Sequence, residues 1–196
     1  MPTITPPFTV PSGQTCLFLT PTNFSGSGES SGGCLGGGWS GVGIGDLSGG
    51  TVSLSGTCLT GPGQVVYIQW DGFKVPMWPE GTVIEAVYPV IYVGSYSSST
   101  PADIWLAING SDYASSPTLD GVGQLSVGSS ADSMGNTEST ITSATIGVPI
   151  NDSSVHDGPS DVVVTWAGLA VYVTLPKKYT GTVVNINIGN TKPLGS

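Results

Sequence analysis

The sequence contains no arginine, and its only cations are Lys74, Lys177, Lys178 and Lys192. Thirteen Asp and Glu residues bring the formal net charge to −9, yet charged residues are only 9% of the chain, against about a quarter in typical proteins. Proteins that bind nucleic acid or anionic membranes do so through Lys and Arg. We therefore predict that neither is a partner. Because the acids are scattered, this acidic balance indicates general solubility.

Long apolar runs are also absent: no stretch of about 18 apolar residues occurs, so we expect no membrane span. The first residues, MPTITPPFTVPSG, lack the basic start and apolar core of a signal peptide, so we expect no export leader. The Ser, Thr and Gly content is nevertheless typical of extracellular proteins. A virion component released by cell lysis would reconcile this extracellular type of composition with the expected lack of a leader. A dedicated secretion system or a truncated sequence would do the same.

Residues that bind metals are scarce. The chain has three cysteines (Cys16, Cys34 and Cys58) and one histidine, His156. An odd count leaves at least one cysteine unpaired within the chain. No Cys-x-x-Cys occurs and His156 is far away in sequence, so buried thiols or one disulfide are favoured over a metal site. We expect neither metal nor cofactor.

A Ser/His/Asp arrangement is weakly indicated. The Gly-x-Ser-x-Gly pattern is met once, at Gly28–Gly32, but inside a low-complexity stretch where chance matches are expected. No strand-to-helix elbow surrounds it, and His156 is better explained as a surface loop residue.

Acidic side chains offer two further candidates. A glycosidase needs two carboxylates facing one cleft, for which the sequence offers Glu80, Glu85 and Asp103. Turn edges and outward strand faces are the more ordinary positions for these acids. A calcium loop is conceivable from the residues Asn151, Asp152, Asp157 and Asp161, but their spacing is not that of an EF-hand. We predict no catalytic residue and no enzymatic activity.

The sequence does contain long runs of β-branched and apolar residues, which are typical of β-strands. The longest run is Asp161–Leu175, and Gly81–Val93 has the same character. We expect these two runs to form the centre of one antiparallel sheet. Ala167-Gly168 indicates a bend or bulge, so two shorter strands are as good a prediction as one long strand. Pro89 indicates an edge position or a nearby bulge.

Further strands recur roughly every 8–12 residues between turn signals. They are predicted at Gln14–Thr20, Thr51–Leu59, Gln64–Trp70, Ala102–Asn109, Val122–Val127, Ser139–Val148 and Gly181–Ile188. Turns are predicted at Asp71-Gly72, with Phe73–Val75 as a short return arm, at Pro76–Gly81, and at Asn109-Gly110. No capped helical period extends over ten residues. This pattern predicts an all-β fold, an antiparallel, jelly-roll-like β-sandwich.

The domain organisation follows from composition. Residues 1–13 carry four prolines and are predicted to form an extended arm, whose partner is either its own domain or a neighbouring subunit. Residues 14–190 are predicted to be one sandwich domain that includes a glycine-rich loop at 21–50. Apolar residues within that loop indicate that it packs against something. Residues 191–196 are a short tail.

Aromatic residues suggest a carbohydrate-binding or adhesive module as the alternative function, since sugars stack on exposed rings. Trp105 and Trp166 lie in apolar strands and are predicted to be core. The candidate ligand-binding residues, with a glycan as the ligand, are Trp39, Trp78, Tyr96 and Tyr113. Loop tryptophans such as Trp39 and Trp78 are more often lids on a small core or contacts with a neighbouring subunit.

Three segments carry a resemblance to a known group of proteins. Pro79-Glu80-Gly81-Thr82-Val83-Ile84 opens a long strand, Asp103-Ile104-Trp105 follows, and Val171-Tyr172-Val173 ends the last pair of β-runs. Over about Trp78–Leu175 this order resembles the β-sandwich structural proteins of tailed bacteriophages, among them decoration and tail accessory proteins. This chain departs from them in carrying Ser, Thr and Tyr where family strands often carry Arg and Lys.

The resemblance implies assembly and offers no active site to carry over. It leads us to expect a structural protein located in the virion, as a capsid decoration or tail accessory component. Its partners would be copies of itself, in a homo-oligomer, and other virion proteins. The arm at residues 1–13 and the glycine-rich loop would serve as docking segments.

Overall fold

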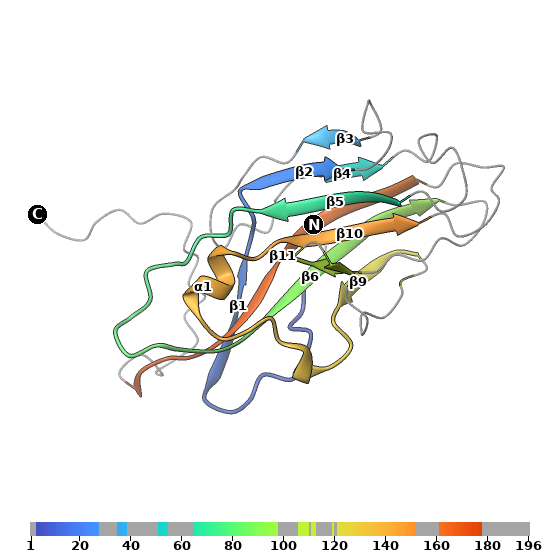
Figure 1. Cartoon of the computed structure of the whole chain (residues 1–196). Helices are drawn as coiled ribbons and strands as arrows, with labels where there is room; N and C mark the ends of the chain where they lie inside the picture. Colours follow the sequence, from blue (N-terminus) through green and yellow to red (C-terminus); the bar gives the residue numbers. More distant parts are fainter. Residues whose placement is uncertain are drawn as a thin grey trace, which may run out of the picture.

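The computed structural model describes residues 3–27, 35–38, 51–54, 65–97, 106–109, 111–112, 119, 121–151 and 161–177. Within these ranges the chain is mostly strand, in two antiparallel sheets, with a 3₁₀ turn at Ser130–Asp132 and a five-residue helix α1 (Glu138–Thr142) (Figure 1). The predicted all-β class is confirmed. No helix in this part of the chain is long and apolar enough to cross a membrane.

The first sheet has six strands. Its order is β3 (Leu35–Gly38), β4 (Thr51–Leu54), β11 (Asp161–Thr174), β6 (Val83–Ser97) and β9 (Gly123–Ser126). The sixth strand, β1 (Gln14–Leu19), also pairs with β11. Strand β4 pairs with the beginning of β11 and β1 with its end, so one long strand supports two short ones.

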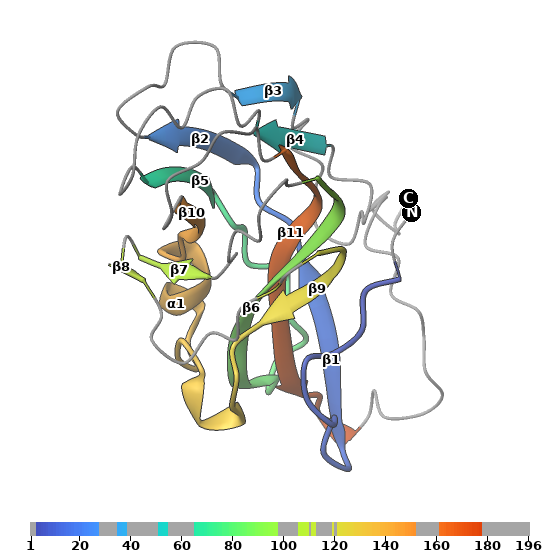
Figure 2. The same ribbon diagram turned by 90° about the vertical axis from the view of Figure 1, so that its right-hand side faces the viewer.

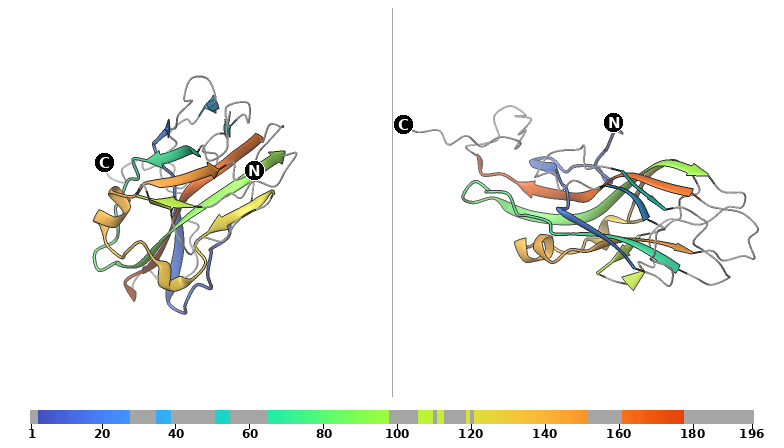
Figure 3. Two further views of the ribbon diagram at one scale, coloured as in Figure 1. Left: turned by 45° about the vertical axis from the view of Figure 1, so that its right-hand side comes forward. Right: turned by 90° about the horizontal axis from the view of Figure 1, so that it is seen from above.

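The second sheet has five strands. Its order is β2 (Asn23–Ser27), β5 (Val65–Asp71), β10 (Ile146–Asn151), β7 (Ala107–Ile108) and β8 (Ser111–Asp112). The chain passes from the first sheet to the second between β1 and β2. Figure 3 shows the two sheets as layers, one over the other. Buried side chains of both sheets belong to one hydrophobic cluster, with Trp70 and Ile146 from one and Ile91 and Leu169 from the other.

The predicted central pair of strands is confirmed, because β6 and β11 pair antiparallel from Asp161 opposite Ser97 to Thr174 opposite Val83. At Ala167-Gly168, where one long strand and two shorter strands were equally good predictions, the structure has one long strand, and the expected bend or bulge is not at these residues. The register shifts lie elsewhere, at Val163–Trp166 and at Tyr172–Val173, and Gly168 pairs with Val90 inside a continuous strand.

Close packing explains the glycine at position 168. A Cβ atom there would lie 2.6 Å from the carbonyl oxygen of Leu19 on the neighbouring strand β1. It would also overlap the ring of Trp166, two residues back on the same face. Glycine at position 168 therefore lets the Leu19 backbone and the Trp166 ring lie close to its Cα atom. Besides a bulge, such close approach is a usual reason for glycine inside a strand.

Pro89 lies opposite Leu169 of β11 but has no partner strand among the described residues on its other side, which fits the predicted edge position. Strand β9 pairs with β6 only from Val90 onward. Before that point, the carbonyl of Val87 accepts a hydrogen bond from the N–H of Met134 at 2.9 Å, so this side of β6 faces a loop. Pro89 is two residues from Val87 and presents its nitrogen to the same side, where no strand requires an N–H donor.

Two local predictions are wrong. Ser139–Val148 was predicted as one strand, but it begins in helix α1, and β10 starts only at Ile146. The side chain of Thr137 caps the helix by accepting the N–H of Thr140 at 3.1 Å. Phe73–Val75 forms no return strand after the turn at Gly72 (φ +73°). Strand β5 already has β2 and β10 as neighbours, so no edge remains for a hairpin arm.

Turn chemistry is predicted more successfully. Strands β7 and β8 form a hairpin around Asn109-Gly110, with Ile108 opposite Ser111, and Asn109 has the positive φ (+51°) that such turns require. At the start of β6 the N–H of Thr82 donates to the carbonyl of Pro79 at 3.0 Å, with Gly81 at φ +85°.

The predicted strands at Gln14–Thr20, Gln64–Trp70 and Val122–Val127 correspond to β1, β5 and β9. Strands β2 and β3 lie inside the predicted glycine-rich loop at 21–50, so part of that segment joins the sheets. The predicted strand Gly181–Ile188 and the tail at 191–196 lie outside the described residues.

Candidate functional site

The N-terminal arm, whose described part is Thr3–Gly13, lies on the six-stranded sheet before the chain turns into β1 (Figure 2). One contact is with Gln124 of β9. The N–H of Thr5 donates to Gln124 Oε1 at 3.0 Å, and Gln124 Nε2 donates to the carbonyl of Thr5 at 2.9 Å. A single amide side chain thus pairs with both backbone groups of one arm residue, as a neighbouring strand would.

A second contact repeats this pattern three residues further on. The N–H of Phe8 donates to the hydroxyl of Tyr172 at 3.0 Å, and that hydroxyl donates to the carbonyl of Phe8 at 2.6 Å. The Phe8 ring packs edge-on against Tyr88, with centroids 4.9 Å apart, and Tyr88 packs edge-on against Tyr172 at 5.4 Å. Hydrogen bonds to the Phe8 backbone and edge-on packing of the Phe8 ring therefore hold the arm at the same residue.

Strand register brings the three residues that contact the arm, Tyr88, Gln124 and Tyr172, to one face of the sheet. Ala86 lies opposite Tyr172, and Tyr88 is two residues along β6 from Ala86. Tyr92, four residues after Tyr88, lies opposite Gln124 on β9. Because side chains two and four residues apart share a face, Tyr88, Gln124 and Tyr172 lie on the same side of the sheet. We call these three residues the arm-binding face.

The arm contributes to the burial of β11, together with β1, whose Phe18 packs on Trp166. Every residue from Trp166 to Val173 is buried, although a strand with only one covered face would alternate with exposed residues. Ile4, Phe8 and Val10 of the arm pack against the core cluster. The sequence prediction left two partners open for the arm, and in this structure its contacts are with its own domain.

The protonation of the site follows from its burial. Burial raises the pKa of Tyr172 to about 12, which the hydrogen bond from Phe8 only partly opposes. Burial likewise raises the pKa of Cys16, which lies opposite Tyr172 in the β1–β11 register, to about 12, and the hydrogen bond to Tyr172 opposes it. Both groups are protonated at neutral pH, so Tyr172 can donate to the carbonyl of Phe8 and Cys16 is not a nucleophilic thiolate.

A turn at Pro11–Gln14 connects the arm to β1. The N–H of Gln14 donates to the carbonyl of Pro11 at 3.0 Å, and Gly13 has φ +85°. A Cβ atom added at Gly13 would meet nothing within 4 Å. The glycine is therefore needed for its backbone conformation alone.

A groove of about 590 Å³ lies beside the arm. Phe8 and Pro11 line it from the arm, and Glu85, Tyr88 and Tyr172 line it from β6 and β11. Thr9, Gln14 and Ser130 add polar groups to its lining, and Glu85 is the one carboxylate among the described lining residues; it accepts a hydrogen bond from Thr174 Oγ1 at 2.6 Å.

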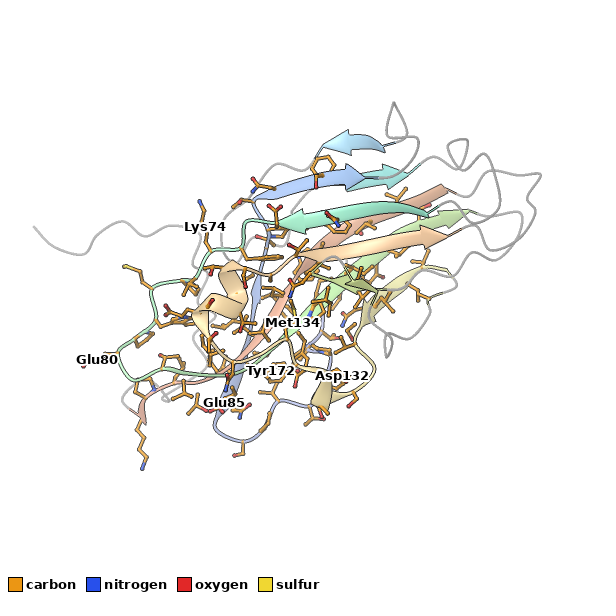
Figure 4. All side chains as sticks on the ribbon, in the orientation of Figure 1. Lys74, Glu80, Glu85, Asp132, Met134 and Tyr172 are labelled. Atoms are coloured by element: carbon orange, nitrogen blue, oxygen red, sulfur yellow. The ribbon has the colours of Figure 1, made fainter. Side chains whose placement is uncertain are left out.

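The predicted acid candidates do not converge. Glu80 is exposed in the turn before β6 and lies away from Glu85 and Tyr172 (Figure 4). The third acid, Asp103, lies outside the described residues. A pair of facing carboxylates, which glycoside hydrolysis requires, is therefore not seen among Glu80 and Glu85.

The predicted glycan-binding residues are only partly described. Trp78 is half-buried in the segment between β5 and β6, packs against the core cluster, and has a buried Nε1 atom with no hydrogen-bond partner among the described residues. Tyr96 lies in β6, but its side chain is not described, and Trp39 and Tyr113 lie outside the described residues. Trp166 is core, as predicted. Trp105 lies outside the described part.

Of the cysteine and histidine residues considered as metal ligands or catalytic groups, the structure describes only Cys16. Cys16 is a free thiol, and Cys34, Cys58 and His156 lie outside the described residues, as do Asp152 and Asp157 of the calcium candidate and the Gly28–Gly32 match. Asn151 ends β10 and Asp161 begins β11, without described side chains. Where the structure describes side chains, no three His, Cys, Asp or Glu residues are grouped to hold a metal ion.

Sequence reasoning did not single out the arm-binding face. One signal was present: Tyr88 and Tyr172 are hydroxyl-bearing residues inside otherwise apolar strands, and a buried tyrosine hydroxyl usually has a hydrogen-bond partner. The identity of that partner was not readable, because Phe8 is 164 residues from Tyr172 in sequence.

No protein-family model matches the chain, and comparisons with curated proteins and with solved structures also return no match. The resemblance to bacteriophage structural proteins therefore stays a prediction.

Replacing Tyr172 with phenylalanine is expected to loosen the arm. The change removes both hydrogen bonds to Phe8 and leaves two partly buried backbone groups unpaired, which costs about 1–3 kcal/mol. Amide hydrogen exchange of residues 3–13 should accelerate while the β6–β11 ladder keeps its protection.

Tyr88→Phe is the matched control, because the Tyr88 hydroxyl donates to the carbonyl of Ser130 at 2.7 Å and not to the arm. It should leave arm exchange nearly unchanged. Unchanged exchange in both variants would mean that ring packing alone holds the arm, and equal acceleration in both would contradict a specific role for the Tyr172 hydroxyl.

Proposed function

We propose that this protein is a non-enzymatic structural component that works by assembling with copies of itself and with other virion proteins, as a capsid decoration or tail accessory protein does. The observation that carries the proposal is the way the arm is bound. An extended, proline-containing segment is held by two side chains that bond its backbone, outside any β-ladder. Such a segment is suited to docking between protein surfaces.

The chemistry of the site supports a binding role over a reactive one. The groups that meet at the arm are an amide, two phenols and a thiol, and burial keeps Tyr172 and Cys16 protonated at neutral pH. The groove beside the arm offers the carboxylate of Glu85, already hydrogen-bonded to Thr174. These groups can hold a polypeptide, and with their raised pKa values neither Tyr172 nor Cys16 is poised to transfer a proton near neutral pH.

We further propose that the two sheets form a jelly-roll-like β-sandwich. Two features support this. Side chains of both sheets share one hydrophobic cluster, and the chain crosses from one sheet to the other between β1 and β2. Crossings of this kind between facing antiparallel sheets are usual in sandwich folds.

The proposed assembly predicts the mass of the purified protein in solution. The full chain is expected to form particles that are multiples of 19.8 kDa, and a variant lacking residues 1–13 should lose most of that association. Light scattering coupled to size exclusion measures this, with circular dichroism to show that both proteins keep their β-structure. A variant lacking only residues 1–2 is the control and should assemble like the full chain.

A full chain that stays a 19.8 kDa monomer at all concentrations would contradict assembly. The virion location is tested separately, by mass spectrometry of purified virus particles. The protein is expected there in many copies, and its absence would contradict the location.

A further inference from the structure

We propose that the arm-binding face of one copy takes the N-terminal arm of a second copy, so that subunits associate by exchanging arms. This inference rests on the proposed assembly function and names the surface and the partner that would carry it. The partner is the segment Thr3–Gly13 of an identical chain.

The first support is that the contacts do not depend on chain connectivity. Gln124 and Tyr172 each bond the N–H and the carbonyl of an arm residue 119 and 164 positions away. A second copy presents identical groups in the same order. Exchange therefore makes the same hydrogen bonds between copies that one copy makes within itself, which is why such swaps cost little.

The second support is the hinge. A single backbone hydrogen bond, from Gln14 N–H to the carbonyl of Pro11, closes the turn between arm and β1, and Gly13 lies at φ +85°. Opening this turn lets the arm continue away from β1 without breaking the β1–β11 ladder, whose first pair is Gln14 opposite Thr174. The change is confined to a few backbone angles.

The third support is that the face needs an occupant. Tyr88 and Tyr172 are 5% and 3% exposed while Phe8 packs on them. An arm that left without replacement would uncover both rings and leave the receptor side chains Gln124 and Tyr172 without their partners. Because Pro6, Pro7 and Pro11 each fix one backbone φ, a departing arm has less conformational freedom to lose when it enters the face of another copy.

The test uses two full-length variants, Thr5→Cys and Gln124→Cys, mixed in equal amounts and oxidised mildly. Positions 5 and 124 of different copies can become linked only if an arm has crossed between copies. Chymotryptic peptide mapping by mass spectrometry identifies that link among any formed by the native cysteines. The expected result is a 5–124 link between copies at least tenfold more abundant than the 5–142 link obtained with Thr142→Cys, an exposed position on α1.

Two further variants make the result decisive. Gly13→Pro forbids the positive φ of the turn, because proline holds φ near about −65°, and should increase the inter-copy link several-fold. The double variant Thr5→Cys with Gln124→Cys should close within one copy, which shows that the two positions can be bridged. If it closes while mixed copies give no more link than the 5–142 control, and Gly13→Pro changes nothing, arm exchange is wrong.

Arm exchange and the proposed virion function can be contradicted independently of each other. A full chain that assembles without the 5–124 link between copies would overturn arm exchange and leave the structural function standing. A link between copies, together with absence of the protein from purified virus particles, would support arm exchange and overturn the virion function.

Discussion

Replacing Gly168 with alanine is expected to lower the free energy of unfolding by about 3 kcal/mol, near the top of the usual range for overpacking a core. The added Cβ would lie 2.6 Å from the carbonyl oxygen of Leu19 and 2.6 Å from Cζ2 of Trp166. The first obstacle is backbone held in the β1–β11 ladder, and the second is a ring with no exposed surface. Neither can move without separating two strands.

Urea unfolding followed by circular dichroism measures this change. Gly147→Ala is the control, because it adds the same methyl to an inner strand, β10, of the other sheet. There the added Cβ would lie 3.1 Å from the Cβ of Ala107 and 3.6 Å from the nearest backbone atom, so a shift of a few tenths of an ångström accommodates it. We expect less than half the effect, and equal losses in the two variants would show that the carbonyl of Leu19 and the Trp166 ring do yield.

Replacing Trp166 with alanine is expected to cost about 3–5 kcal/mol, the usual loss for a buried large aromatic residue. The side chain is fully buried, and its ring packs edge-on against Phe18, with centroids 5.7 Å apart. Its buried Nε1 atom has no hydrogen-bond partner among the described residues. The loss should therefore come from packing and burial of apolar surface.

Two comparisons sharpen this prediction. Trp78→Ala removes the same side chain from a half-buried position and should cost clearly less than Trp166→Ala. The double variant of Trp166→Ala with Gly168→Ala should lose less than the sum of the two, because removing the ring removes one of the two obstacles to a Cβ at position 168. Strict additivity would mean that the carbonyl of Leu19 alone requires the glycine.

The β6–β11 pair shows what local pattern can predict. Long β-branched, apolar runs prefer extended backbone, and two such runs of similar length pair with each other because each needs a neighbour for its N–H and C=O groups. The hairpin at Asn109-Gly110 and the turn at Gly81 were also readable, since only a few residue types adopt positive φ.

Other features depended on which neighbour was available. Phe73–Val75 has strand composition but no free sheet edge, because β2 and β10 already flank β5. Ser139–Val148 has an alternating pattern, yet the cap from Thr137 starts a short helix over its first residues before the strand begins. In each case the pattern described the side chains correctly, and competition for backbone partners decided the outcome.

The sequence by itself determined the all-β class, the central ladder and the tight turns, because each depends on the preferences of residues close together in the chain. Only the tertiary structure decided where the arm lies, which side chains hold it and why position 168 is glycine. Those depend on contacts between residues more than a hundred positions apart, where Gln124 meets Thr5 and Tyr172 meets Phe8, and on the strand register that sets the face of each receptor side chain. A one-residue slip would turn either receptor side chain to the opposite face, and no local signal reports that register.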